Sequence, residues 1–302
     1  MSATQPDGVE GTRMTLGEHL DELRKHLLRS ALALLVTFSV GYAFYGEISR
    51  LITWPFHEAV REINAATTER MRALVDARLA ADPEAWKAYF EPGYPETIEL
   101  LADHRVEDRL AAIGPLEGFQ FTMDIALYFA LFTGAPYCLW ELWRFVAAGL
   151  YANERRAVTR YVPWSVGLFV AGMVFSFRWC VPWVLYYLAT AFPTEEIKPQ
   201  WRVSEYFSVL STMCLGMGIL FQLPVAMSFV MRIGLVQPST FAKYRKYFYF
   251  ASFVIAAILS PPDWFSTLAM CVPMMVLYEL GILVGRFVAR PRATPLGPRG
   301  NA

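Results

Sequence analysis

The sequence has few charges and few cysteines. Only 18% of its 302 residues are charged, whereas 55% are hydrophobic, a balance too apolar for an ordinary soluble domain of this size. The net charge is zero, so it indicates no polyanionic partner, and we expect no nucleic-acid binding. Cysteines occur singly in apolar runs, without CxxC spacing, at Cys138, Cys180, Cys214 and Cys271. They predict small buried side chains and no metal site.

Catalytic motifs are also missing. The sequence has no HExxH, no GxSxG and no pair of aspartates inside an apolar stretch. No catalytic constellation can be assembled from it, so we predict neither an enzyme nor a cofactor. The first fourteen residues are polar and lack an apolar core, and we therefore expect no cleaved signal peptide.

Long apolar stretches are the main feature that is present. A bilayer core needs about 20 apolar helical residues, and six stretches approach that length: Ser30–Gly46, Phe121–Trp140, Tyr161–Tyr187, Tyr206–Met231, Tyr247–Ser260 and Trp264–Tyr278. The last two are short, and we expect them to form a hairpin that thins the bilayer locally. The sequence thus predicts an all-α, polytopic membrane protein with six transmembrane helices.

The placement of Lys and Arg predicts the orientation of these helices. Basic residues are concentrated before the first stretch, between the second and third, between the fourth and fifth, and after the sixth. Because cytoplasmic loops carry the excess of Lys and Arg, both termini are predicted to be cytoplasmic. The expected divisions are a cytoplasmic amphipathic helix (1–29), transmembrane helix 1 (30–46), an enlarged external loop or cap (47–118), transmembrane helices 2–6 (119–290) and a disordered tail (291–302).

The external loop is long and contains several prolines. Its middle, residues 65–80, reads as a polar helix with a sparse apolar stripe at Met71, Leu74, Val75 and Leu79. We expect this loop to form a folded cap.

Two cytoplasmic segments carry candidate binding residues. Residues 15–28, TLGEHLDELRKHLL, place leucines on one face of a helix and Glu22 on the polar face. Glu154 follows a candidate N-cap, Asn153. Each glutamate also has an ordinary interpretation: Glu22 can pair with Lys25 or His26 along its helix, and Glu154 can favour the helix dipole.

Polar groups at membrane depth are costly unless they are satisfied. Gln222 lies in the fourth stretch beside Pro224, so it indicates either a partner contact or a hydrogen bond between helices of one subunit. Glu279 lies late in the sixth stretch or at its cytoplasmic interface. Asp263 follows Pro261 and Pro262 in an external turn and can cap the next helix.

Taken together, several motifs resemble the TatC family, in order and at suitable positions. They are HLDELRKHLL, PYCLWELWRFVAAGLYANERR, GILFQLPVA, SPPDWFS and VPMMVLYELGI, and the resemblance covers about residues 15–56 and 115–288. It implies a receptor subunit of the bacterial inner membrane that recognises twin-arginine signal peptides and exports folded proteins with the protonmotive force. The implied partners are the lipid bilayer, single-span TatA and TatB subunits, and further copies within a hetero-oligomeric complex.

The resemblance also implies roles for particular residues. Glu22 and Glu154 match the acidic residues that contact the paired arginines, Phe145 belongs to the same patch, and Arg24 matches a basic residue of the first helix. Pro55 matches the proline after the first span, and Asp263 lies in the PPD turn with Pro261 and Pro262. Gln222 would meet the signal peptide or a partner helix.

Three departures separate this chain from the family pattern. Gln222 stands where Glu is frequent, residues 148–150 read AGL in place of PGL, and the first external loop is longer than usual. The alternative function is a secondary transporter or channel, but the apolar stretches have few central acids and no matching pair of broken helices.

Overall fold

The structure is a computed structural model that describes residues 16–81, 106–111, 114–149, 152–191, 201–261 and 263–288; the side chains of residues 16, 78, 79, 152–160 and 288 lie outside the description. Almost all of the described chain is helical, and its one β feature is a bridge between Ala111 and Arg202. The predicted all-α class is confirmed for this part of the chain. The predicted tail, residues 291–302, lies outside it.

The first helix, α1 (Leu16–Ala43), is longer than predicted. The expected amphipathic helix and the first span are one uninterrupted helix of 28 residues, so the boundary between 29 and 30 is not a structural one. No proline or glycine pair breaks the helix there, and the polar first turns continue directly into the apolar ones.

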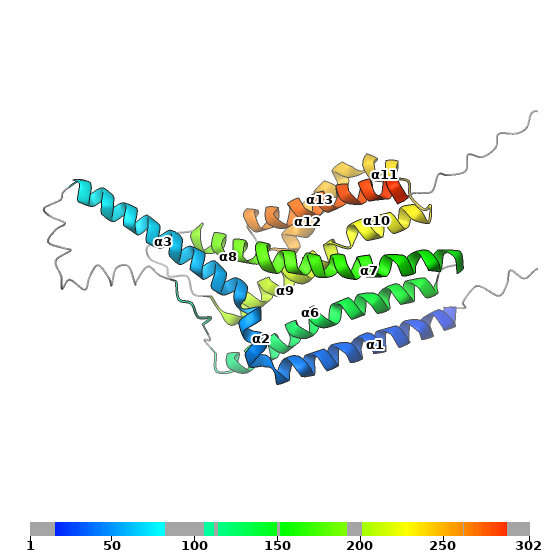
Figure 1. The fold of residues 1–302 in the computed structure, drawn as a ribbon, viewed down its shortest axis with the longest axis horizontal. Coiled ribbons are helices and arrows are strands. Elements are labelled where there is room, and N and C mark those ends of the chain that lie inside the picture. Colours follow the sequence, from blue (N-terminus) through cyan, green and yellow to red (C-terminus); the bar gives the residue numbers. More distant parts are fainter. Residues whose placement is uncertain are drawn as a thin grey trace, which may run out of the picture.

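The remaining long helices follow in antiparallel order (Figure 1). They are α6 (Glu117–Ala148), α7 (Ala152–Phe175) with α8 (Val181–Thr190), α9 (Val203–Leu220) with α10 (Leu223–Arg232), α12 (Arg245–Leu259) and α13 (Trp264–Val288), with the short α11 (Pro238–Lys243) before α12. Among the described residues, five segments are long and apolar enough to cross a membrane. The fifth predicted span, Tyr247–Ser260, corresponds to α12, which has only 15 residues and is not among these five segments.

Two of these segments are interrupted at recognisable residues. A π-helical turn, Ser176–Cys180, joins α7 to α8 and contains Arg178, whose guanidinium carbon lies 4.4 Å from the ring centroid of Trp54. Between α9 and α10 the helix breaks at Phe221 and Gln222, where Pro224 cannot donate a backbone hydrogen bond.

The prediction that both helices of the last hairpin are short is wrong for the second one. Helix α13 continues past Glu279 to Val288, over 25 residues, and is about 37 Å long at 1.5 Å per residue. The charge of Glu279 does not end the helix because Arg245 and Tyr249 of α12 bind its carboxylate. Of the two helices in this hairpin, only α12, at about 22 Å, is shorter than the hydrocarbon core.

The segment after α1, which the sequence predicts to be external, begins with α2 (Tyr45–Ile52) and α3 (Trp54–Ala81). The helix predicted over 65–80 therefore starts eleven residues earlier, with Pro55 buried in its first turn. Its packed face lies at its beginning, at Phe56, Ala59, Val60 and Ile63. The predicted stripe is not the packed face, since Leu74 is 58% exposed; the side chain of Leu79 lies outside the description.

Residues 106–111, here called the strap, fasten α3 to the loop before α9. Asn64 of α3 exchanges two hydrogen bonds with the backbone of Val106, at 2.9 and 3.1 Å. Nδ1 of His57 lies 2.6 Å from Oδ1 of Asp108. The backbone of Ala111 then donates to Trp201 and accepts from Val203. Three attachments in six residues fix this part of the cap.

Helix α9 forms the centre of the core. Tyr206, Phe207, Leu210, Met213 and Met217 are at most 1% exposed. Helix α1 lies at one edge of the bundle beside α6, and α12 and α13 lie at the other edge (Figure 1). Helix α13 packs closely on α10, because a Cβ at Gly281 or Gly285 would collide with Met227 or Met231. This small-xxx-small spacing allows two helices to approach closely in a membrane.

Candidate functional site

The candidate site lies where α1 begins and α6 ends. The two helices run antiparallel and pack along their length. They approach closely because Gly41 faces the backbone of Ala126 and Gly134 faces Leu34. This packing brings the charged first turns of α1 against the last turns of α6.

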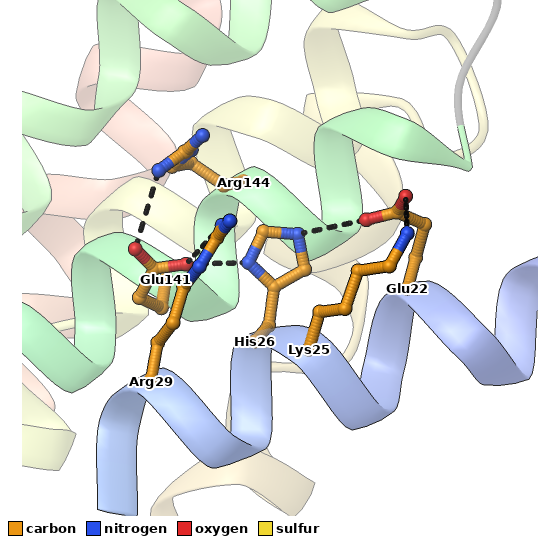
Figure 2. Close-up of polar contacts among 6 residues, drawn as sticks. All are labelled: Glu22, Lys25, His26, Arg29, Glu141 and Arg144. Carbon is orange, nitrogen blue, oxygen red and sulfur yellow. Dashed lines mark hydrogen bonds and ion pairs between the residues drawn. The ribbon is translucent and has the colours of Figure 1, made fainter. Parts of the chain in front are cut away.

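Glu141 of α6 is the centre of the charge cluster. It is 1% exposed, and its Oε2 lies 2.5 Å from Nδ1 of His26. Arg144 donates to Oε1 at 3.2 Å, and a guanidinium nitrogen of Arg29 lies 3.9 Å from Oε2. Figure 2 shows the carboxylate between Arg144 on one side and His26 with Arg29 on the other. One buried acid therefore holds three basic side chains from two helices.

A buried carboxylate needs such partners. Removing a charge from water costs several kcal/mol unless opposite charges and hydrogen bonds compensate. Nδ1 of His26 donates to Glu141 when it carries a proton. Nε2 lies 3.6 Å from Oε2 of Glu22 and attracts that carboxylate when it is protonated as well. The pair fixes the orientation of the imidazole ring.

Glu22 is the more accessible acid of the cluster. Its Oε1 accepts from Lys25 at 3.1 Å, and its side chain is 31% exposed. The ordinary interpretation of Glu22, pairing with Lys25 and His26 on its own helix, is the arrangement that the structure has (Figure 2). A role in binding a signal peptide stays a prediction.

Phe145 lies beside these residues on α6. Its ring centroid is 4.6 Å from that of His19 and 6.4 Å from that of His26, so an aromatic surface adjoins the Glu22 carboxylate. Arg24 is exposed and projects from a different side of α1, because residues two apart on a helix do not face each other. Glu154 lies in the first turn of α7, and its side chain is outside the described residues.

Gln222 has partners within the chain. Its Nε2 donates to the backbone oxygen of Ser165 at 3.0 Å, and its Oε1 accepts from the hydroxyl of Ser165. Trp143 in turn donates to that hydroxyl at 2.6 Å. The chain of hydrogen bonds joins α6, α7 and the break before α10, which is the intrasubunit alternative that the sequence left open. A partner contact at Gln222 remains a prediction.

Glu279 and Asp263 also have intramolecular roles. Arg245 donates to Oε2 of Glu279 at 2.7 Å, and Tyr249 donates to Oε1 at 2.6 Å. Oδ1 of Asp263 accepts from the backbone of Ser266 at 2.8 Å, so Asp263 is the N-cap of α13 that its ordinary interpretation predicted. Pro261 precedes it, and Pro262 lies outside the described residues.

Sequence reasoning missed Glu141. The available signal was a single acid in the last third of a long apolar helix, within the motif that carries the resemblance. Its main partner, His26, is 115 residues away in the chain, and no local spacing reveals that contact. Among the described residues, no group of three or more His, Cys, Asp or Glu side chains could hold a metal ion.

Comparison with known proteins gives consistent results. A family model described as "Sec-independent protein translocase protein (TatC)" matches residues 18–273. The chain is 30% identical to the Sec-independent protein translocase protein TatCy of Bacillus subtilis over 278 residues, which cover 92% of this chain and 91% of that protein. It is 32% identical over 203 residues to TatC of Helicobacter pylori, covering 67% of this chain and 76% of that one.

Solved structures agree with these matches. The crystal structure of the twin arginine translocase receptor TatC in DDM superposes with a TM-score of 0.65 at 26% identity, covering 89% of this chain and 99% of that one. A second TatC crystal structure gives 0.61 at 27% identity, covering 90% and 100%. All of these proteins are named as translocase proteins or receptors, so the transporter or channel alternative gains no support from them.

Proposed function

This chain belongs to the TatC family of Sec-independent protein translocases, and on that premise we propose that it is the receptor subunit that recognises twin-arginine signal peptides. It is a multi-pass membrane protein. The TatC family works within the Tat translocase together with other subunits. For this chain we propose six spans with both termini in the cytoplasm, a place in the bacterial inner membrane, partnership with single-span TatA and TatB, and export driven by the protonmotive force.

The observation that carries the proposal is the accessible Glu22 carboxylate over a buried charge cluster. Glu141 holds His26 in place, and Nε2 of His26 lies 3.6 Å from the Glu22 carboxylate. Among the described residues, the other partner of Glu22 is the exposed Lys25, and such an exposed pair contributes little to stability. An incoming guanidinium can therefore replace Lys25 without disturbing the buried cluster.

The chemistry favours arginine over lysine at such a site. A guanidinium is planar and binds a carboxylate through two parallel hydrogen bonds, whereas an ammonium is a compact, strongly hydrated charge. The Phe145 ring, which lies against His19 and near His26, is an aromatic group on which a guanidinium can stack. Glu154, in the first turn of the next helix, would supply the second carboxylate.

The direct test is site-specific crosslinking of a signal peptide to the full chain in membranes. Peptides with paired arginine and paired lysine are compared on the native protein, on Glu22→Gln and on Glu154→Gln. Asp21→Asn is the matched control, since it removes the same charge from an exposed neighbour on the same helix. We expect arginine-dependent crosslinking that falls about tenfold or more in each glutamate variant and stays unchanged in Asp21→Asn.

Two results would contradict the proposal. Equal crosslinking of the arginine and lysine peptides would mean that the carboxylates do not select the guanidinium. An equal loss in Asp21→Asn would mean that only the general negative charge of α1 matters. The energy source is tested separately, by exporting a folded twin-arginine cargo into vesicles with and without an ionophore and with and without TatA and TatB.

A further inference from the structure

A second polar site lies at the opposite edge of the bundle, between α12 and α13. It is a groove of about 530 Å³ at the end where α12 begins and α13 ends. Arg245, Glu279 and Arg286 line its polar part, and Val276, Leu280 and Leu283 line its apolar part. This groove takes no part in the arrangement around Glu22.

The charges of the groove are not balanced within the described chain. Glu279 uses one carboxylate oxygen for Arg245 and the other for Tyr249. Arg286 lies two helical turns beyond Glu279 and forms no ion pair with any residue that the structure describes. The Nε of Arg245 is buried and has no acceptor there. The groove therefore has one positive charge in excess and one donor without a partner.

The apolar wall is exposed over the same stretch of α13. Val276, Leu280 and Leu283 are 52%, 45% and 49% exposed, and α13 is one of the segments able to cross a membrane. The wall therefore faces lipid, with the arginines at the level of the headgroups. Lys243 and Lys246 are exposed near this end of α12 but do not line the groove.

We propose that this groove binds one anionic phospholipid, with its phosphate between Arg245 and Arg286 and an acyl chain along Leu280 and Leu283. Phosphate oxygens would bind the part of the Arg245 side chain that lines the groove and neutralise Arg286, as basic pockets between transmembrane helices do for acidic headgroups. A single apolar partner helix would cover the wall but would leave the charge of Arg286 without a partner. The inference depends on α12 and α13 lying in a membrane and is independent of signal-peptide binding at Glu22.

Lipid retention by the full-length protein tests the proposal. The protein is exchanged into nanodiscs of phosphatidylcholine with a small fraction of phosphatidylglycerol, and the lipid that stays bound after mild detergent extraction is counted by native mass spectrometry. We expect phosphatidylglycerol to be retained over phosphatidylcholine, and Arg286→Gln to lower that retention about fivefold to tenfold. Arg286→Gln removes no contact of the described chain, so folding should be preserved.

Matched controls distinguish a specific lipid-binding site from a general effect of surface charge on lipid retention. Lys246→Gln removes the same charge from the residue next to Arg245, outside the groove lining, and should leave retention unchanged. Millimolar inorganic phosphate should not displace the lipid, because it cannot occupy the apolar wall. The proposal is overturned if Lys246→Gln acts as strongly as Arg286→Gln, if phosphate displaces the lipid, or if a photocrosslinker at Leu283 captures a partner polypeptide instead of lipid in native membranes.

Discussion

Two histidine–carboxylate pairs occupy opposite ends of the bundle, and they differ almost only in their surroundings. At the α1–α6 end, His26 and Glu141 approach to 2.5 Å. At the strap, His57 and Asp108 approach to 2.6 Å. The side chains of the first pair are 9% and 1% exposed, and those of the second are 41% and 66% exposed. Similar geometry therefore accompanies very different degrees of desolvation.

Desolvation determines how much each pair contributes to the stability of the folded protein. Breaking a buried pair leaves an uncompensated charge, at a cost of about 3–5 kcal/mol. An exposed pair is screened by water and salt and contributes roughly 0–1 kcal/mol. The first pair should thus be needed to hold α1 on α6, whereas the second should contribute little beyond the other attachments of the strap.

The largest effect is expected from Glu141→Ala. The change leaves the buried His26 without its acceptor and removes a partner of the half-exposed Arg144, and we expect a loss of about 3–5 kcal/mol. The measurement is the thermal and denaturant stability of the purified protein in detergent. Glu141→Gln keeps a hydrogen-bond acceptor and should lose less.

Glu47→Ala is the control for this change. Glu47 is 78% exposed, and its nearest basic group, on Arg50, is 4.0 Å away, so its removal should change stability by less than about 0.5 kcal/mol. If Glu141→Ala were as mild as Glu47→Ala, burial would not govern the difference between the two histidine pairs.

The next largest effect is expected from Tyr206→Phe, which tests burial without charge. The hydroxyl of Tyr206 donates to the backbone oxygen of Ile52 at 2.6 Å, in a residue that is 0% exposed. Removing it leaves a buried carbonyl with one partner fewer, at a cost of about 1–2 kcal/mol. The same unfolding measurement applies, and Tyr247→Phe, at a 60% exposed site, is the control with no expected loss.

A smaller effect is expected from Glu279→Gln, because this pair is intermediate in exposure. The side chains of Arg245 and Glu279 are 42% and 38% exposed, and an amide keeps an acceptor for one of the two donors. We expect a loss of about 1 kcal/mol. A loss as large as that of Glu141→Ala would show that position in the membrane outweighs fractional exposure.

These contacts show which parts of the structure could be predicted from the sequence. The apolar stretches predicted most of the helices, and the PPD turn predicted the helix N-cap at Asp263. Both features depend on residues that are close together in the sequence. The end of α13 was predicted wrongly, since Glu279 is neutralised by Arg245, 34 residues earlier. The long α1 was divided in two because its polar first turns pack on α6, which the local pattern does not reveal.

The candidate site was predicted only in part, because some of its contacts join residues that are far apart in the sequence. Glu22 and Phe145 were identified through motif resemblance, and the structure brings Glu22 next to His26 and Phe145 next to His19 and His26. Glu141 was missed because its burial is produced by tertiary packing. The strap could not be predicted from the sequence either, because Asn64 and Val106 are 42 residues apart and neither residue type indicates a partner.

The smallest effect is expected from Asp108→Asn, and it completes the comparison. The asparagine keeps an oxygen for His57 and loses only the charge, in a pair that water screens from both sides, so the loss should be under about 1 kcal/mol and should fade at high salt. Asn64→Ala is the informative partner variant, because it removes both hydrogen bonds to Val106 and should loosen the strap more than Asp108→Asn does. Hydrogen exchange of the amides of residues 106–111 measures this directly. Faster exchange in Asp108→Asn than in Asn64→Ala would mean that the exposed ion pair, and not the half-buried contact of Asn64 with the backbone, fastens the strap.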